Sequence, residues 1–253
     1  MVMNRTIDRG FKILELLKES EKGLTLKEIS EKMNIPKTST FDIVQSLLAI
    51  GIIERPDEDI KRYTIGIKLF ALGSSYMSRK SIYNVGNRYI KSLAEKLNKT
   101  TFIGVENNAK VIYIQKYEPK VTIKTSCVVG SSAEIYSTSL GKSILAFSSE
   151  RKRQDIISKI EFKKLQKNTI TDVKTLMEDL EKTKQRGYSI DNQENEDGIF
   201  CIGAPIFNQD GKVIASLSAS GIYKESTDIA FESREVKNTA MLISRELGYI
   251  GNN

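Results

Sequence analysis

Three serines alternate along residues 214–221, and a stretch of small residues at 139–142 opens a predicted helix. In a strand, Ser216, Ser218 and Ser220 point to one face, where their hydroxyls can donate to a ligand. The first amides of a helix are free donors, and the helix dipole favours an anion there. Together these groups are suited to a small carboxylate. The alternative interpretation is that the serines form the wet face of the strand and that the helix start binds only water.

The sequence contains no histidine, which excludes Ser-His-Asp, Cys-His and histidine-metal chemistry. Cys127 and Cys201 are too far apart in the sequence to form a metal knuckle, and two cysteines make no disulfide framework. Cys201 is therefore expected to be a small core residue, the alternative being a reactive thiol. We predict neither a catalytic residue nor a metal, and no cofactor.

At 253 residues the chain is long enough for two domains. No run approaches the roughly 18 apolar residues of a membrane span, and the first ten residues are mixed polar, so we expect a cytoplasmic protein. The net charge of +7 favours polyanionic partners, but residues 1–80 carry only about +3 of it. Charge alone is therefore weak support for binding to nucleic acid.

The first domain has the pattern of a helix-turn-helix. Apolar residues recur at helical spacing over residues 7–18, and Thr25 with Glu28 forms a capping box at the start of a second helix. A turn at residues 34–36 leads to a third helix that ends near Gly51 and whose first hydroxyls, at residues 38–40, are expected to cap it.

The third helix has two different faces. One side, with Thr40, Ile43 and Val44, is predicted to face the core. The opposite side carries Thr38, Asp42, Gln45 and Ala49, flanked by Ser39 and Ser46. A small polar face of this kind suits the DNA major groove, although it is also what any solvated helix shows.

Two β-prone runs, 52–55 and 62–65, follow the third helix and predict a hairpin wing. The acidic residues 57–59 at its tip oppose the approach of phosphates, so the contribution of the wing is uncertain. The predicted DNA-binding residues are Lys37, Thr38, Ser39, Asp42, Gln45, Arg55, Lys61 and Arg62.

The predicted domains are a winged helix-turn-helix at 1–66, a linker helix at 67–80 and a second domain at 81–253. In the second domain, helices are expected at 82–97, 150–160, 172–186 and 228–247, with another opened by residues 137–139. Strands are expected at 101–106, 111–117, 121–126, 188–191, 200–207 and 213–220. This order predicts an α+β fold with a mostly antiparallel sheet.

Over nearly its full length the chain resembles the IclR family of bacterial transcriptional regulators. The motifs that carry the resemblance lie at residues 9–14, 35–40, 62–66, 138–142, 186–191, 197–206 and 217–221. The resemblance implies a GAF-like effector-binding domain behind the winged helix, small organic or aromatic acids as effectors, and dimers or tetramers on partly palindromic double-stranded DNA. Carried over by motif, and joined to the helix-start amides, the effector-binding residues would be Ser139, Leu140, Gly141, Asp191, Cys201, Ser218 and Ser220.

The chain departs from the family pattern in two places. Residues 133–136 read Ala-Glu-Ile-Tyr where relatives commonly have Leu-Pro-Leu-His, so an imidazole is missing and Glu134 adds a charge near the expected pocket. Asp42 stands where many relatives have a basic residue, and a carboxylate accepts from cytosine N4 but repels phosphate. The operator sequence is therefore expected to differ.

The main functional hypothesis is a ligand-responsive, sequence-specific DNA-binding regulator, expected to be a repressor and not an enzyme. A redox sensor or enzyme that uses Cys201 is the alternative, but a cysteine nucleophile needs a base or cation beside it and the chain has no histidine. A winged-helix protein that only binds other proteins is a third class, which salt-dependent DNA binding would exclude.

Overall fold

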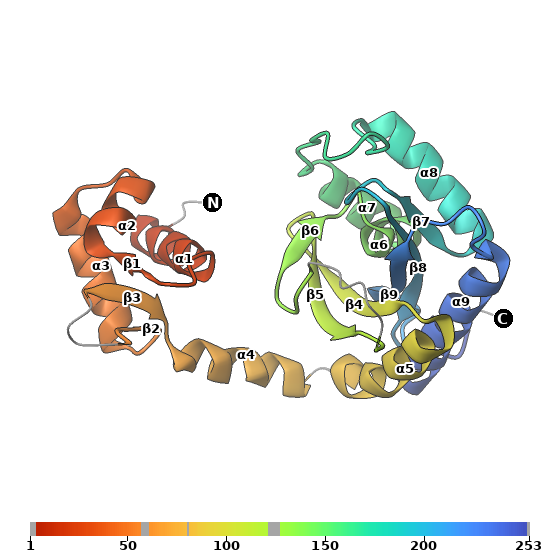
Figure 1. The fold of residues 1–253 in the computed structure, drawn as a ribbon, viewed down its shortest axis with the longest axis horizontal. Coiled ribbons are helices and arrows are strands. Elements are labelled where there is room, and N and C mark those ends of the chain that lie inside the picture. Colours follow the sequence, from red (N-terminus) through yellow and green to blue (C-terminus); the bar gives the residue numbers. More distant parts are fainter. Residues whose placement is uncertain (1–3, 57–60, 80, 121–126, 252–253) are drawn as a thin grey trace. The chain divides into compact units, whose positions relative to one another are not determined.

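The computed structural model describes residues 4–56, 61–79, 81–120 and 127–251 (Figure 1). Contacts divide the chain into two compact units, Met1–Arg79 and Lys80–Asn253. Each unit has a hydrophobic core of its own. Among the described residues, no helix has both the length and the hydropathy required to cross a membrane.

The first unit is a helix-turn-helix followed by a small antiparallel sheet in the order β1-β3-β2. Its elements are α1 (Arg5–Lys18), β1 (Leu24–Thr25), α2 (Leu26–Met33), α3 (Lys37–Ala49), β2 (Ile53–Glu54), β3 (Arg62–Ile65) and α4 (Ile67–Arg79). The core contains Ile13 of α1, Ile29 of α2 and Val44 of α3, all fully buried. The predicted wing is therefore present as β2 and β3, while its tip at 57–60 lies outside the described residues.

Two helix starts in this unit test the capping predictions. Thr25 and Glu28 form the predicted capping box, each side chain bonding the backbone N–H of the other. The predicted hydroxyl cap of α3 is wrong, because Pro36 takes the N-cap position and makes no side-chain cap. The fixed φ of proline lets the helix begin directly after it, at Lys37. The Thr40 hydroxyl instead lies inside the helix and donates to the Pro36 carbonyl.

The second unit is built on a six-stranded antiparallel sheet in the order β6-β5-β4-β9-β8-β7. Its strands are β4 (Thr100–Asn107), β5 (Lys110–Tyr117), β6 (Ser132–Glu134), β7 (Ser189–Asn192), β8 (Ile199–Phe207) and β9 (Val213–Ile222). Its helices are α5 (Ser81–Leu97), α6 (Ser139–Phe147), α7 (Glu150–Ile157), α8 (Val173–Arg186) and α9 (Ile229–Glu246). The predicted α+β fold is confirmed.

Helices cover both faces of this sheet (Figure 1). On one face α5 and α9 pack through Ile90 and Val236 against the apolar side of β9, which includes Leu217. On the other face α6 and α8 pack through Leu140 and Leu176. The side of β9 that carries the serines therefore faces α6.

Small differences from the predicted elements have local causes. The β4–β5 turn lies at Asn108 and Ala109, one residue later than expected, and both have positive φ as a two-residue hairpin turn requires. The short strand β6 was not expected, and the strand predicted at 121–126 lies outside the described residues. The helix α8 ends at Gly187, whose φ of 80° allows the left-handed cap.

Candidate functional site

The strand register brings hydroxyls and a thiol together on the face that α6 covers. Thr100 of β4 and Cys201 of β8 both pair with Ser220 of β9, while Phe102 and Gly203 pair with Ser218. All three alternating serines are buried. The interpretation of the serines as a wet strand face is therefore wrong, because α6 shields this face from solvent.

A small cavity of about 30 Å³, called the inner cavity below, lies between this face and the start of α6. Its lining is Phe102, Tyr113, Cys127, Thr138, Ser139, Leu140, Asp191, Asn195, Glu196, Ile199, Cys201, Ser218 and Ser220. Six of the seven predicted effector-binding residues are in this set. Because one water needs about 10–15 Å³ on this measure, the cavity holds only the end group of a ligand or about two waters.

The seventh residue, Gly141, does not line the cavity. Its N–H donates to the Thr138 hydroxyl at 3.1 Å, so the prediction that this amide is a free donor is wrong. A side chain at position 141 would overlap the carbonyl of Ile135, which explains the glycine. The amides of Ser139 and Leu140, at the first two positions of α6, have no acceptor within the helix and are the donors that remain.

Asp191 gives the inner cavity an acidic group. Burial raises the pKa of its carboxyl to about 7, and the nearby Glu194 carboxylate raises it further, although Asp191 accepts from the Glu194 N–H at 2.9 Å. Below that pH the carboxyl is protonated and can donate a hydrogen bond. Glu196 also lines the cavity.

Glu134 is not the charge near the cavity that the sequence predicted. It pairs with Lys110 at 3.4 Å, across β6 and β5, and is absent from the lining. Tyr136, which stands where relatives have histidine, is fully buried, and its hydroxyl bonds the backbone of Lys163. Both residues are therefore structural, and the acids of the cavity are Asp191 and Glu196.

Two thiols form part of the wall. The Cys201 thiol donates to the Ser220 hydroxyl at 3.1 Å, and burial raises its pKa well above the ordinary value, with Asp191 adding to the effect. Burial also raises the pKa of the Cys127 thiol. Both cysteines are therefore neutral thiols with little nucleophilic character.

Behind the cavity, a buried cation ties α6 to its surroundings. Lys142 is 1% exposed, and its ammonium lies 2.5 Å from Glu194 and 3.3 Å from Asp179 of α8. Glu194 is also buried, which raises its pKa, while Lys142 acts in the opposite direction. Because the Glu194 N–H bonds Asp191, this ion group is connected to the cavity wall.

Sequence reasoning missed several lining residues. Phe102 and Tyr113 alternate with core residues on β4 and β5, so the register of that hairpin would have placed them beside Ser218. Asn195 and Glu196 lie in the loop between β7 and β8, where no periodicity exists to place them. Cys127 carried no signal beyond its residue type.

The recognition face of α3 has the predicted polarity. Thr40, Ile43 and Val44 are buried, whereas Thr38 and Asp42 are exposed. The remaining predicted residues of this helix are Lys37, which is exposed, and Ser39 and Gln45, which are partly buried. Phe41 is also exposed beside Asp42, a feature that the sequence analysis passed over.

In the wing, the three predicted basic residues differ in what they contact. Arg62 donates to the Gly23 carbonyl at 2.7 Å and pairs with Glu28, so its guanidinium joins β3 to the start of α2. Arg55 bonds the Tyr63 hydroxyl at 2.8 Å and lies over that ring, with its own side chain exposed. Lys61 is exposed. Arg62 is therefore mainly structural, and Arg55 and Lys61 remain the candidates for phosphate contacts.

Comparison with known proteins matches both units. The family described as "IclR helix-turn-helix domain" matches residues 6–57, and "Bacterial transcriptional regulator IclR C-terminal" matches residues 74–245. The chain belongs to the IclR family of bacterial transcriptional regulators. It therefore has a DNA-binding helix-turn-helix and an effector-binding C-terminal domain.

Individual relatives agree with this assignment. The crystal structure of Thermotoga maritima IclR is 33% identical and superposes with a TM-score of 0.75, covering 96% of this chain and 99% of that one. The Escherichia coli repressor AllR is 26% identical, over 96% of this chain and 90% of its own length. An IclR homologue from Microbacterium hydrocarbonoxydans, solved with 4-hydroxybenzoate, is 20% identical with a TM-score of 0.81, covering 96% of this chain and 98% of that one. The relatives are regulators and not enzymes, which confirms that expectation.

Proposed function

We propose that this IclR-family regulator is a repressor whose DNA affinity changes when a small organic acid occupies the inner cavity. The observation that carries the proposal is the convergence of free helix-start amides at Ser139 and Leu140 with the buried hydroxyl of Ser218 on one cavity. Among the described residues the Ser218 hydroxyl has no hydrogen-bond partner. A buried donor without a partner costs free energy, which a ligand acceptor would recover.

A carboxylate suits these donors best. Backbone amides at a helix start bind an anion without needing a cationic side chain, and Asp191 supplies a further donor while it is protonated. The 4-hydroxybenzoate bound to the Microbacterium homologue is itself an acid, which supports the same ligand class for this chain. The repressor role is supported by the similarity to AllR.

The Cys201 alternative has little support. Redox sensing by this residue would require a thiolate, but burial and the neighbouring Asp191 favour the neutral thiol. Its hydrogen bond to Ser220 is the contact of a wall residue. We therefore expect Cys201→Ser to leave effector binding largely intact.

A thermal-shift screen of organic acids with two to six carbons, together with 4-hydroxybenzoate, tests the ligand class. At least one acid should raise the melting temperature and alter operator affinity in the same concentration range, since the two effects are linked. The stabilisation should fall in Ser218→Ala and survive Cys201→Ser. If only cations or wholly apolar compounds bound, the carboxylate proposal would be lost.

DNA recognition is proposed to divide between two sets of residues. Asp42 and Gln45, in the middle of α3, read bases, while Thr38, Ser39 and Arg55 hold phosphates, together with Lys37 and Lys61. In a gel-shift titration, Gln45→Ala should relax specificity at one base position, whereas Lys61→Ala should weaken all sequences equally. A uniform loss in Gln45→Ala would remove its base-reading role.

The proposed functional unit is a homodimer, or a tetramer built from dimers, on a partly palindromic operator in the cytoplasm. A single winged helix contacts too little DNA for tight specific binding, and two symmetric half-sites solve this. The first unit supports the proposal, because α1 and α4 expose large apolar residues that a partner would cover: Ile7, Phe11, Ile67, Phe70 and Leu72. A reporter gene that became more active on deletion of the regulator would identify a repressor, and the opposite result would identify an activator.

A further inference from the structure

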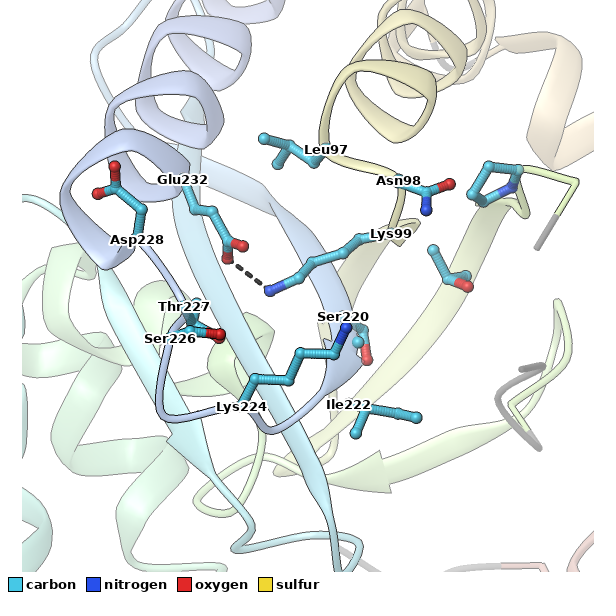
Figure 2. A pocket seen from close by; sticks show the side chains of 13 residues that line it. Leu97, Asn98, Lys99, Ser220, Ile222, Lys224, Ser226, Thr227, Asp228 and Glu232 are labelled. Atoms are coloured by element: carbon cyan, nitrogen blue, oxygen red, sulfur yellow. Dashed lines mark hydrogen bonds and ion pairs between the residues drawn. The ribbon is translucent and has the colours of Figure 1, made fainter. Parts of the chain in front are cut away.

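A second, larger cleft of about 320 Å³, called the outer cleft below, lies at the end of β4 and β9 (Figure 2). The turn between α5 and β4 contributes Lys99 and Thr100, the end of β9 contributes Ser220, and the segment before and within α9 contributes Lys224 and Glu232. The Discussion of family motifs does not touch these lysines, because neither belongs to a motif that carries the resemblance.

The outer cleft and the inner cavity share one wall residue, Ser220. Thr100 pairs with Ser220 across β4 and β9, so both hydroxyls lie on the face that also carries Ser218. Thr100 is 4% exposed, and within the described ranges its hydroxyl has no hydrogen-bond partner. The outer cleft therefore continues the inner cavity along the same sheet face, and a buried unpartnered hydroxyl opens into it.

Most charges in the outer cleft are already paired. The Lys99 ammonium lies 2.6 Å from the Glu232 carboxylate, and both side chains are largely buried, at 12% and 13% exposed. Asp228 caps α9 and accepts from the Phe231 N–H at 2.9 Å. Lys224 is the exception, because it is exposed and, among the described residues, makes no ion pair. In Figure 2 its side chain extends toward Ser220, at the boundary between the two cavities.

The sizes of the two cavities indicate how a ligand would use them. The inner cavity, at about 30 Å³, has room for a single end group, whereas the outer cleft, at about 320 Å³, has room for a chain of several atoms. An acid held at the start of α6 must therefore extend past Ser220. Its far end would then meet the Lys224 ammonium together with the Thr100 hydroxyl, which suits a second anionic group.

We propose that the effector is a two-ended acid, with one end in the inner cavity and a second anionic group bound by Lys224 in the outer cleft. This inference rests on the proposed function of the inner cavity as an acid site. It adds Lys224 and Thr100 as specificity-determining residues, which would distinguish diacids from monoacids of the same length.

Calorimetric titration of the full chain with matched pairs of acids tests the inference. The pairs are butyrate and succinate, valerate and glutarate, and hexanoate and adipate, each measured with the wild type, Lys224→Gln and Lys212→Gln. Lys212 is an exposed lysine in the turn before β9 and serves as the matched control. At least one diacid should bind about tenfold more tightly than its monoacid, as expected for a charge-assisted hydrogen bond.

This advantage should vanish in Lys224→Gln, persist in Lys212→Gln, and leave monoacid binding unchanged in both variants. Thr100→Val should also reduce the advantage without changing monoacid affinity. Equal affinity for both members of every pair, or a diacid advantage that survives Lys224→Gln, would overturn the two-ended effector while leaving the inner cavity as an acid site. If no acid of either kind bound, the proposed function and this inference would both be overturned.

Discussion

Asp191 is the residue on which the chemistry of the inner cavity depends most. Its carboxyl is buried beside hydroxyls and thiols and has a pKa raised to about 7. It therefore changes from hydrogen-bond donor to anion close to neutral pH, whereas an ordinary aspartate would be ionised throughout. An acid ligand meets a donor below pH 7 and a repelling charge above it.

We predict that this carboxyl makes the stability of the second unit depend on pH. Because the pKa is raised on folding from 3.8 to about 7, the folded state favours the proton, and stability falls as pH rises between these values. Asp191→Asn removes this dependence, so its melting temperature relative to wild type should rise between pH 4 and pH 7 and then level off. Thermal unfolding at pH 5 and pH 8 measures the difference. An identical offset at both values would contradict the raised pKa.

Lys142 leads to a second prediction at the scale of single residues. Removing its charge in Lys142→Met leaves the buried Glu194 carboxylate without its cation, and breaking a buried pair in this way costs about 3–5 kcal/mol. The double variant Lys142→Met with Glu194→Gln should recover part of that loss, because no unpaired charge remains. Chemical denaturation of the three proteins provides the comparison. A double variant as unstable as the single one would show that packing, and not charge, is what Lys142 supplies.

Single residues were predictable from the sequence where a period placed them. The alternation of residues 216, 218 and 220 put their hydroxyls on one face, and the structure agrees. The donor at Gly141 was predicted wrongly, because the sequence does not show that the Thr138 hydroxyl caps this amide. Glu196 was missed because its position depends on a loop, which has no period to read.

At the scale of elements, the clamp between β3 and α2 is the contact that positions the wing. The guanidinium of Arg62 reaches both the Gly23 carbonyl and the Glu28 carboxylate. Glu28 is at the same time the N3 residue of the α2 capping box, and its hydrogen bonds with Thr25 lower its pKa. The helix start and the wing are therefore held through one carboxylate.

We expect Arg62→Met to lower the stability of the first unit by about 1 kcal/mol, the usual worth of one partly exposed charged hydrogen bond. Its DNA binding should keep the same dependence on salt concentration, because the guanidinium is engaged within the protein. In Lys61→Met the slope of log affinity against log salt should instead fall by about one phosphate contact. A reduced slope in Arg62→Met would assign Arg62 to the phosphates.

Elements with strong local signals were predicted well. The capping box at Thr25 and the left-handed cap at Gly187 mark helix ends by side-chain or backbone chemistry alone. The two-residue strand β1 was not predicted, since so short a segment has no alternation to detect and exists only by pairing with β3. The start of α3 was misread because proline at position 36 replaces the hydroxyl cap.

At the scale of the whole molecule, the apolar surface of the first unit supports assembly. Phe11 of α1 is 66% exposed and Phe70 of α4 is 73% exposed. Burying such side chains against a second copy would stabilise a dimer through the hydrophobic effect. Two recognition helices would then be available for the two half-sites of a palindrome.

We predict that Phe11→Asp combined with Phe70→Asp yields a monomer of the first unit's interface and weakens operator binding by at least tenfold. The fold of each unit should persist, because both side chains already face solvent. Light scattering at micromolar concentration and a gel-shift titration make the two measurements. Ile250→Asp is the matched control, since Ile250 is 94% exposed and lies at the end of the chain. An unchanged dimer in the double variant would place the interface elsewhere.

The first turn of α6 lies between two backbones, and this has a consequence for redesigning the regulator as a biosensor. A side chain at Gly203 would overlap the Ser139 carbonyl, and one at Gly141 would overlap the Ile135 carbonyl. The helix cannot retreat to enlarge the binding site, so libraries that vary residues on this turn would mostly yield misfolded proteins. Room for a bulkier inducer has to be made on the opposite wall, by shortening Ile199 or Phe102. Mutagenesis aimed there should change the inducer while keeping the DNA response.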